Sequence, residues 1–313
     1  MRLALPRLSA LSALSAMFLT AVLLGGCVSV RTHGDPAATA ATANARATGS
    51  YVVAAPPPND GLNATAWFQK SVERDLVYGT LYRAAGEHLA AALADTSWDA
   101  LPRSDRSNDP RTLPPAIIVD IDETVLDNSY SQVRQMRDGK DFNETDWDVW
   151  VQQRAATPLP GSLAFLRSAA DKGVTVFYIS NRKVSQAQAS FDNLRAVGFP
   201  VTDATQVLNA GTVVEGCEQH GSDKGCRRLL VGRNYRVLMQ FGDQVGDFVS
   251  IASNTQAGRR AAITPYLDWV GQRWWVLPNP MYGSWEPALF GNDWNLSPTS
   301  RRAAKEAALE DLR

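Results

Sequence analysis

The chain has 313 residues, of which 45% are hydrophobic and 20% are charged, and its formal net charge is -1. This composition fits a folded protein with a sizeable core and excludes a chain that is disordered throughout. The lack of a basic excess disfavours nucleic acid polymers as partners. The three histidines, His33, His88 and His220, are too scattered for a histidine-rich metal site.

The first 26 residues have the features of an export signal. Arg2 and Arg7 precede an apolar stretch from Leu8 to Leu24, and two glycines follow it. This order predicts a cleaved signal peptide over residues 1–26. A membrane-spanning helix is the weaker alternative, because the apolar stretch is slightly short of the ~20 residues that cross a bilayer.

Cys27 ends this segment in a Leu-Gly-Gly-Cys sequence that resembles a bacterial lipobox. The resemblance implies a lipid anchor on the Cys27 sulfur, and Val28 in place of an aspartate implies the outer membrane. A plain secretory signal with an incidental cysteine is the alternative. Residues 27–60 are rich in Ala, Thr, Gly and Pro, which predicts a flexible tether after the lipidated cysteine.

The chain beyond the tether first shows a helical period. Apolar residues recur at helical spacing between Leu62 and about Ala94, which predicts one or two helices. Prolines and polar residues between residues 101 and 115 then indicate a surface connection.

Short apolar runs and longer amphipathic stretches alternate after this connection. The predicted strands are Ala116–Ile121, Val174–Ile179, Thr205–Leu208, Tyr235–Phe241 and Arg273–Leu277. The predicted helices are 159–172, 186–197 and 223–232, with Gly173 and Gly198 at two helix ends. Continuous apolar strands are typical of a sheet covered on both faces, so we expect an α/β fold with a doubly wound, Rossmann-like parallel sheet over residues 61–300. Residues 301–313 are expected to form a C-terminal tail.

Carboxylates gather where two of the predicted strands end. Asp120 and Asp122 follow the first strand, and Asp243 and Asp247 follow the fourth. Ligands of such folds bind at the carboxyl ends of the strands. Aspartates directly after a buried strand need compensation, and Mg²⁺, which prefers hard oxygen ligands, is the expected cofactor.

Two further cysteines, Cys217 and Cys226, are nine residues apart. An oxidising compartment would let them form a disulfide that closes a short loop. Two free buried thiols are the alternative.

The motifs resemble a known family. The order Asp-x-Asp-x-Thr, Ser, Lys, Gly-Asp-x-x-x-Asp resembles the haloacid dehalogenase (HAD) superfamily of phosphohydrolases. Three longer motifs, DIDETVLDNS, YISNR and LPNPMYGSWE, resemble those of the class C acid phosphatases, the lipoprotein e(P4) family. The resemblance covers about residues 62–295. It implies a Mg²⁺-dependent phosphatase that hydrolyses phosphomonoesters through a phospho-aspartate.

Roles for the aspartates follow from the resemblance and from the chemistry. Asp120 is the expected nucleophile, and Asp122 the general acid and base. The expected metal ligands are Asp120, Asp243, Asp247 and, through its backbone carbonyl in relatives, Asp122. Asp247 acts through bound water or by orienting Lys224.

The same resemblance gives the phosphate-binding residues. Ser180 and Lys224 are expected to hold phosphoryl oxygens together with backbone amides near Asn181. In isolation, a capping serine and a solvated lysine would be the simpler interpretations. Relatives usually carry Ser after this lysine, whereas Gly225 follows here, so the proposed disulfide is expected to fix the local geometry.

The interval of about 127–158 is too long for a simple strand-to-helix loop and is expected to form a small, mainly helical cap. Large aromatic side chains near a phosphate pocket can stack on a nucleobase or nicotinamide ring. The candidates for such a substrate clamp are Trp147, Trp150, Tyr282 and Trp285. Packing between cap and sheet explains each of them equally well.

The sequence therefore predicts an exported, outer-membrane-anchored phosphatase for small phosphomonoesters, with nucleoside 5′-monophosphates or related aromatic compounds as the expected substrates. Phosphotransfer to an alcohol and ligand binding without catalysis are the alternatives. A homodimer is compatible with the sequence, which does not determine the oligomeric state.

Overall fold

The computed structural model describes residues 59–311. The expected signal peptide, the expected lipidation at Cys27 and nearly all of the expected tether lie outside these residues. Within them, no helix is both long and apolar enough to cross a bilayer.

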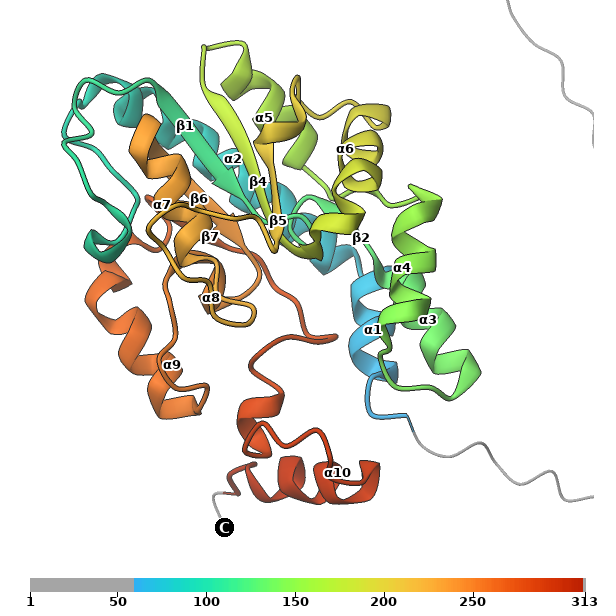
Figure 1. The fold of residues 1–313 in the computed structure, drawn as a ribbon. Coiled ribbons are helices and arrows are strands. Elements are labelled where there is room, and N and C mark those ends of the chain that lie inside the picture. Colours follow the sequence, from blue (N-terminus) through green and yellow to red (C-terminus); the bar gives the residue numbers. More distant parts are fainter. Residues whose placement is uncertain (1–58, 312–313) are drawn as a thin grey trace, which may run out of the picture. The chain divides into compact units, whose positions relative to one another are not determined.

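A five-stranded parallel sheet forms the centre of the described domain (Figure 1). Its strands are β1 (Pro115–Val119), β4 (Thr175–Lys183), β5 (Val207–Ala210), β6 (Arg236–Gly242) and β7 (Trp274–Val276). The spatial order is β5-β4-β1-β6-β7, with every neighbouring pair parallel. All five predicted strands are confirmed within a few residues of their expected bounds.

Both faces of the sheet are buried, because alternate side chains of β1 enter two different cores. Ile117 and Val119 pack with the helices on one face, and Ala116 and Ile118 with those on the other. The first face carries α2 (Val72–Ala94), α5 (Ser162–Ala170) and α6 (Ala187–Ala196); the second carries α7 (Gly225–Asn234), α8 (Val245–Phe248) and α9 (Gln256–Ile263). This arrangement confirms the doubly wound α/β fold and explains why the strands are apolar throughout.

The N-terminal helical region consists of α1 (Leu62–Lys70) and α2, which confirms the prediction of one or two helices. Ser71 separates them and caps α2, because its side chain accepts a hydrogen bond from the backbone N–H of Arg74. The buried stripe of α2 includes Tyr78 and Tyr82. These two tyrosines point into the domain toward the loop after β1.

A two-stranded antiparallel ladder joins the cap to the core. β2 (Leu126–Asp127) pairs with β3 (Thr157–Pro158), and the chain between them forms α3 (Ser129–Asp138) and α4 (Glu144–Gln153). The structure thus places a small helical cap over the interval expected for it. Helix α3 packs against α1 (Figure 1).

The C-terminal part differs from the prediction. Residues 301–313, expected to be a tail, begin inside α10 (Pro298–Ala307), which Ser297 caps through the backbone N–H of Ser300. Lys305 lies 3.0 Å from Asp60, so α10 is tied to the beginning of the described chain. The remaining helical turns are 3-10 segments: Arg103–Asp105, Val184–Gln186, Ala204–Gln206, Thr264–Trp269 and Pro287–Leu289.

Candidate active site

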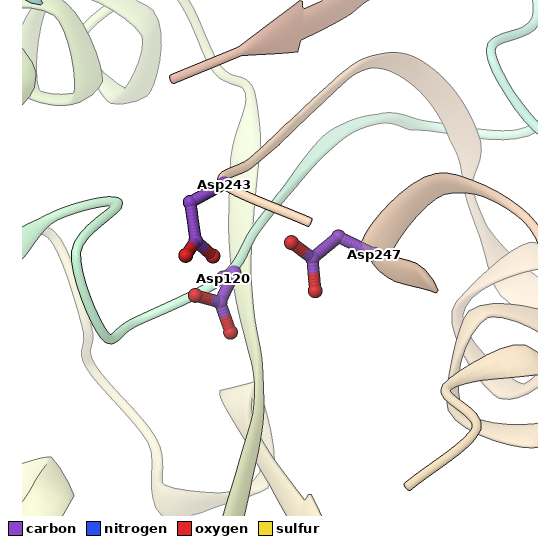
Figure 2. Close-up of side chains that lie close together, drawn as sticks. All are labelled: Asp120, Asp243 and Asp247. Atoms are coloured by element: carbon purple, nitrogen blue, oxygen red, sulfur yellow. The ribbon is translucent and has the colours of Figure 1, made fainter. Parts of the chain in front are cut away.

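Three aspartates meet at the carboxyl edge of the sheet. Asp120 follows β1, Asp243 follows β6, and Asp247 lies in α8. β1 and β6 are parallel neighbours, so the residues after them lie side by side. Each aspartate offers one oxygen atom, and these atoms all lie within 4.8 Å of one another (Figure 2). The structure thus brings three of the four expected metal-binding residues together.

Lys224, the residue before α7, is the cation of this cluster. It is 2% exposed, its Nζ contacts Asp120, and the same atom lies 2.7 Å from Oδ1 of Asp247. Nζ also donates to the backbone carbonyl of Ile179 at 2.7 Å. An ammonium group has three hydrogens, so Lys224 is fully satisfied without water. The other oxygen of Asp120 accepts from the Thr124 hydroxyl at 3.1 Å.

Burial changes the charge state of the cluster. Burial raises the pKa of Asp120 to about 7; Lys224 acts in the opposite direction, and the carboxylates of Asp247 and Asp122 add to the rise. Burial also raises the pKa of Asp243 well above its usual value, again with help from neighbouring carboxylates. Burial alone would lower the pKa of Lys224, but Asp120 and Asp247 together raise it. These shifts mean that Lys224 alone does not keep all the carboxyl groups of the cluster ionised at neutral pH.

The side chains present fit a divalent cation with oxygen ligands. Three carboxylates at this spacing are hard donors of the kind that Mg²⁺ prefers. Asp243 is held in place by Asn279 and Gln244, whose amides donate to its Oδ2 at 2.7 and 2.8 Å. Residues around a metal ligand often orient it in this way.

The Asp122 carboxylate has its own partners outside this cluster. It forms an ion pair with Arg182, whose Nη2 lies 2.8 Å from its Oδ1. Ser180 donates to its Oδ2 at 3.1 Å, and Asn128 donates to its Oδ1 at 2.8 Å. Hence the side chain of Asp122 is not part of the acidic cluster, and its expected metal contact through the backbone carbonyl stays a prediction.

Helix α2 holds the loop that carries Asp120 and Asp122. Glu123 has a left-handed backbone (φ 58°), a conformation that costs a non-glycine residue about 1–3 kcal/mol. Tyr78 donates to the carbonyl of Glu123 at 2.6 Å, and Tyr82 donates to that of Thr124 at 2.8 Å. These two buried hydrogen bonds keep the loop in its strained form.

The expected phosphate-binding residues lie around the same edge. Ser180 and Asn181 lie in the C-terminal half of β4, and Arg227 donates to the carbonyl of Ser180 and to Oδ1 of Asn181. Asn181 is exposed and Ser180 is fully buried. Lys224 thus reaches the nucleophile candidate directly, while Ser180 reaches Asp122.

The aromatic clamp candidates differ in their surroundings. Trp150 is only 4% exposed, and its indole N–H donates to Asn128 at 2.8 Å, so its expected contact with substrate is corrected: the ring is packed within the protein. Trp147 is half-buried and lies against the guanidinium of Arg182. Tyr282 and Trp285 are half-buried as well. These three stay predictions.

An open apolar pocket of about 360 Å³ is lined in part by Asn279, which also contacts the acidic cluster. Its lining residues are Ala64, Trp67, Pro278, Asn279 and Pro280. Asn279 connects the two features, because its amide is bonded to Asp243. The pocket was not predicted from the sequence, since it is formed by two segments about 200 residues apart.

A disulfide joins Cys217 and Cys226, with 5.6 Å between their Cα atoms. Cys226 lies in the first turn of α7, two residues after Lys224. The pairing expected from the sequence is therefore present. It ties the irregular segment before α7 to the start of that helix, close to Lys224.

Six described residues form side-chain hydrogen bonds with the side chains of predicted site residues but were not themselves predicted: Thr124, Asn128, Arg182, Arg227, Gln244 and Asn279. Arg182 and Asn279 lie inside the YISNR and LPNPMYGSWE motifs, so the motifs were the available signal. Their partners became visible only with the fold, because each bonds to an aspartate at least 36 residues away.

The raised pKa of Asp120 predicts how stability depends on pH. The folded state binds this proton up to about pH 7, whereas an unfolded aspartate releases it near pH 3.9. Without metal, the contribution of Asp120 to the free energy of unfolding should fall as pH rises from about 4 to 7, by on the order of 2–4 kcal/mol, and then stay constant. Thermal unfolding of the EDTA-treated protein, compared with Asp120→Asn between pH 4.5 and 8, measures this. Parallel pH curves for the two proteins would contradict it.

Comparison with known proteins identifies relatives of this chain among the acid phosphatases. A family model described as HAD superfamily, subfamily IIIB (acid phosphatase), matches residues 76–285. The class C acid phosphatase from Bacillus anthracis has 32% sequence identity and a TM-score of 0.69, covering 81% of this chain and 98% of that chain. Its tungstate-bound structure gives the same values.

Two plant proteins match a shorter part. The stem 31 kDa glycoprotein of Glycine max and acid phosphatase 1 of Solanum lycopersicum are each 26% identical over 166 and 167 residues, or 53% of this chain. The chain spans 58% and 57% of the length of these relatives.

The parallel sheet with aspartates at its carboxyl edge is the architecture of the HAD superfamily. Within it, the chain belongs to the acid phosphatases of subfamily IIIB, the group with class C enzymes as structural neighbours. The resemblance inferred from the motifs is confirmed.

Proposed function

We propose that this protein hydrolyses phosphomonoesters, with Asp120 as the nucleophile and Mg²⁺ as the cofactor. The observation that carries the proposal is the buried Asp120 between Lys224 and two further carboxylates, at the strand edge where the family places its active site.

The metal would be held by Asp120, Asp243 and Asp247. Bound there, it would neutralise phosphate charge that otherwise repels the Asp120 carboxylate. Tungstate, a tetrahedral oxyanion, is bound in the structure of the Bacillus anthracis relative. That finding supports oxyanion binding by this fold.

The reaction then proceeds in two steps. In the first, an Asp120 oxygen attacks phosphorus, the ester P–O bond breaks, and Asp122 gives its proton to the leaving oxygen. In the second, Asp122 takes a proton from water as the water oxygen attacks phosphorus. The bond between phosphorus and Asp120 breaks, and inorganic phosphate leaves.

The substrates proposed are nucleoside 5′-monophosphates or related aromatic phosphomonoesters. Trp147, Tyr282 and Trp285 are the candidate stacking residues. The apolar pocket beside Asn279 offers a second surface that suits a ring rather than a charged group, because its lining is almost wholly carbon. Both features favour an apolar or aromatic leaving group.

We further propose that the protein acts outside the cytoplasm, anchored by lipid on Cys27 in the outer membrane. The apolar stretch before Cys27 and the lipobox-like ending support this location. The disulfide near Lys224 is consistent with an oxidising compartment.

The test is phosphate release by the full chain in detergent from 5′-nucleotides, nicotinamide mononucleotide, an aryl phosphate and glycerol phosphate. We expect release that EDTA abolishes and added Mg²⁺ restores, with higher kcat/KM for the aromatic substrates. Release that continues unchanged in EDTA would contradict the metal requirement. No release from any substrate by folded, metal-supplied protein would contradict the phosphatase.

A further inference from the structure

Asn128 lies at a junction between the cap and the core. It follows β2, is 1% exposed, and its side-chain amide donates to Oδ1 of Asp122 at 2.8 Å. Its side-chain carbonyl accepts from the indole of Trp150 at 2.8 Å and from Arg182 at 3.2 Å. With two donors on its oxygen and a carboxylate on its nitrogen, the amide has only one orientation that satisfies all its partners.

Arg182 fixes the same carboxylate from a second direction. It is 2% exposed, and two of its nitrogens, Nε and Nη2, lie 3.0 and 2.8 Å from Oδ1 of Asp122. Its remaining nitrogen donates to the Ser190 hydroxyl at 3.2 Å. A guanidinium that contacts a carboxylate through two nitrogens restricts the direction of the carboxylate as well as its charge.

Trp150 links this pair to the cap. It lies in α4 and belongs to the buried core shared by cap and sheet. An indole has a single N–H, and that of Trp150 is used on Asn128. A displacement of α4 would therefore remove one of the hydrogen bonds that orient Asn128, and through it Asp122.

We propose that Asn128 and Arg182 are positioning residues for Asp122, and that Trp150 makes the orientation of Asp122 depend on the cap. This inference rests on the proposed role of Asp122 as the proton donor. As the bond between Asp120 and phosphorus forms and the ester P–O bond breaks, the proton of Asp122 passes to the leaving oxygen. Asp122 is left as a carboxylate, which Arg182 and Asn128 then stabilise.

The activity lost when Asp122 is misdirected should therefore depend on the leaving group of the substrate. An alkoxide is a strong base and needs the proton as it departs, whereas dinitrophenolate departs without it. Well-placed general acids contribute about 10²–10⁴-fold, so a misdirected one loses part of that factor only where the proton is needed. A variant that merely weakens the fold would lose activity equally on both kinds of substrate.

The experiment compares kcat/KM for glycerol phosphate and for dinitrophenyl phosphate in full-chain variants, because kcat/KM reports on the step in which the leaving group departs and not on the later hydrolysis of the phospho-aspartate. Trp150→Phe keeps a ring but removes the N–H, and we expect about a 10-fold loss on glycerol phosphate with less than 2-fold on dinitrophenyl phosphate. Arg182→Gln should show a larger difference between the losses on the two substrates. Arg182→Lys should lose less on glycerol phosphate than Arg182→Gln. Trp98→Phe is the matched control, since it also removes an indole hydrogen bond, which goes to the carbonyl of Leu238 and not to a partner of Asp122.

Asp122→Asn tests the proposed acid role of Asp122 separately from the coupling of Asp122 to the cap. If it loses far more on glycerol phosphate than on dinitrophenyl phosphate, Asp122 is the acid, and equal losses in Trp150→Phe would then overturn the coupling to the cap. If Asp122→Asn itself shows no dependence on the leaving group, the proposed role of Asp122 fails first. Unfolding temperatures of all variants identify any general loss of fold.

Discussion

Replacement of Asp120 by asparagine will abolish turnover and leave the fold intact. The change removes the nucleophile at nearly constant volume, and kcat should fall by about 10⁴-fold or more, as for other enzymes that lose a nucleophile. Burial raises the pKa of the Asp120 carboxyl group to about 7, so its ionised form is costly in the fold. The neutral amide of asparagine removes that cost. For this reason the variant should unfold at the same temperature as the wild type or higher at neutral pH without metal.

Asp109→Asn is the matched control, because Asp109 is exposed and lies in the connection that leads into the opposite end of β1. It should keep full activity. Phosphate release and thermal unfolding are measured on both variants. Substantial residual turnover in Asp120→Asn, with no reversion in the purified protein, would remove Asp120 from the nucleophile role.

Replacement of Lys224 by methionine will reduce both activity and stability. Methionine keeps much of the length of the side chain but leaves the Asp120 and Asp247 carboxylates without their cation. Breaking a buried ion pair in this way costs about 3–5 kcal/mol. Lys224 is also the proposed phosphate-binding cation, so its loss should lower kcat by about 10²–10³-fold.

Two comparisons make this prediction specific. Lys172→Met, at an exposed lysine after α5, should change neither property. A second substitution, Asp247→Asn, added to Lys224→Met should recover part of the stability because it removes one uncompensated carboxylate, yet it should not recover activity. If Lys224→Met is as stable as the wild type in EDTA at pH 8, the ion pairs seen here do not stabilise the fold.

Much of the fold was predictable, because it is encoded in local patterns. The strands are continuous apolar runs, and Gly173 and Gly198 at the expected helix ends both have positive φ. The helices that the sequence analysis did not predict lack such clear local patterns. Helices α9 and α10 contribute no fully buried residue to the two cores, and neither contains a long apolar run of the kind that marks the strands.

The acidic cluster was predictable for a different reason. Residues that follow neighbouring parallel strands must meet at one edge, so Asp120 and Asp243 could be placed together without coordinates. The partners of Asp122 could not, because Arg182 and Asn128 reach it through side-chain directions that depend on packing. Trp150 shows the same limit: its burial and its bond to Asn128 follow from the position of α4 over the sheet, not from its neighbours in sequence.

The short ladder between β2 and β3 bears on how such proteins can diverge. The chain leaves the core at Asp127 and returns at Thr157, two paired residues, so the intervening segment can be exchanged for another without altering the path of the core. Recombination or insertion at this junction would place a different cap on the same catalytic core. A grafted cap would, however, need to supply a donor for Asn128 in place of Trp150, which narrows the set of exchangeable segments.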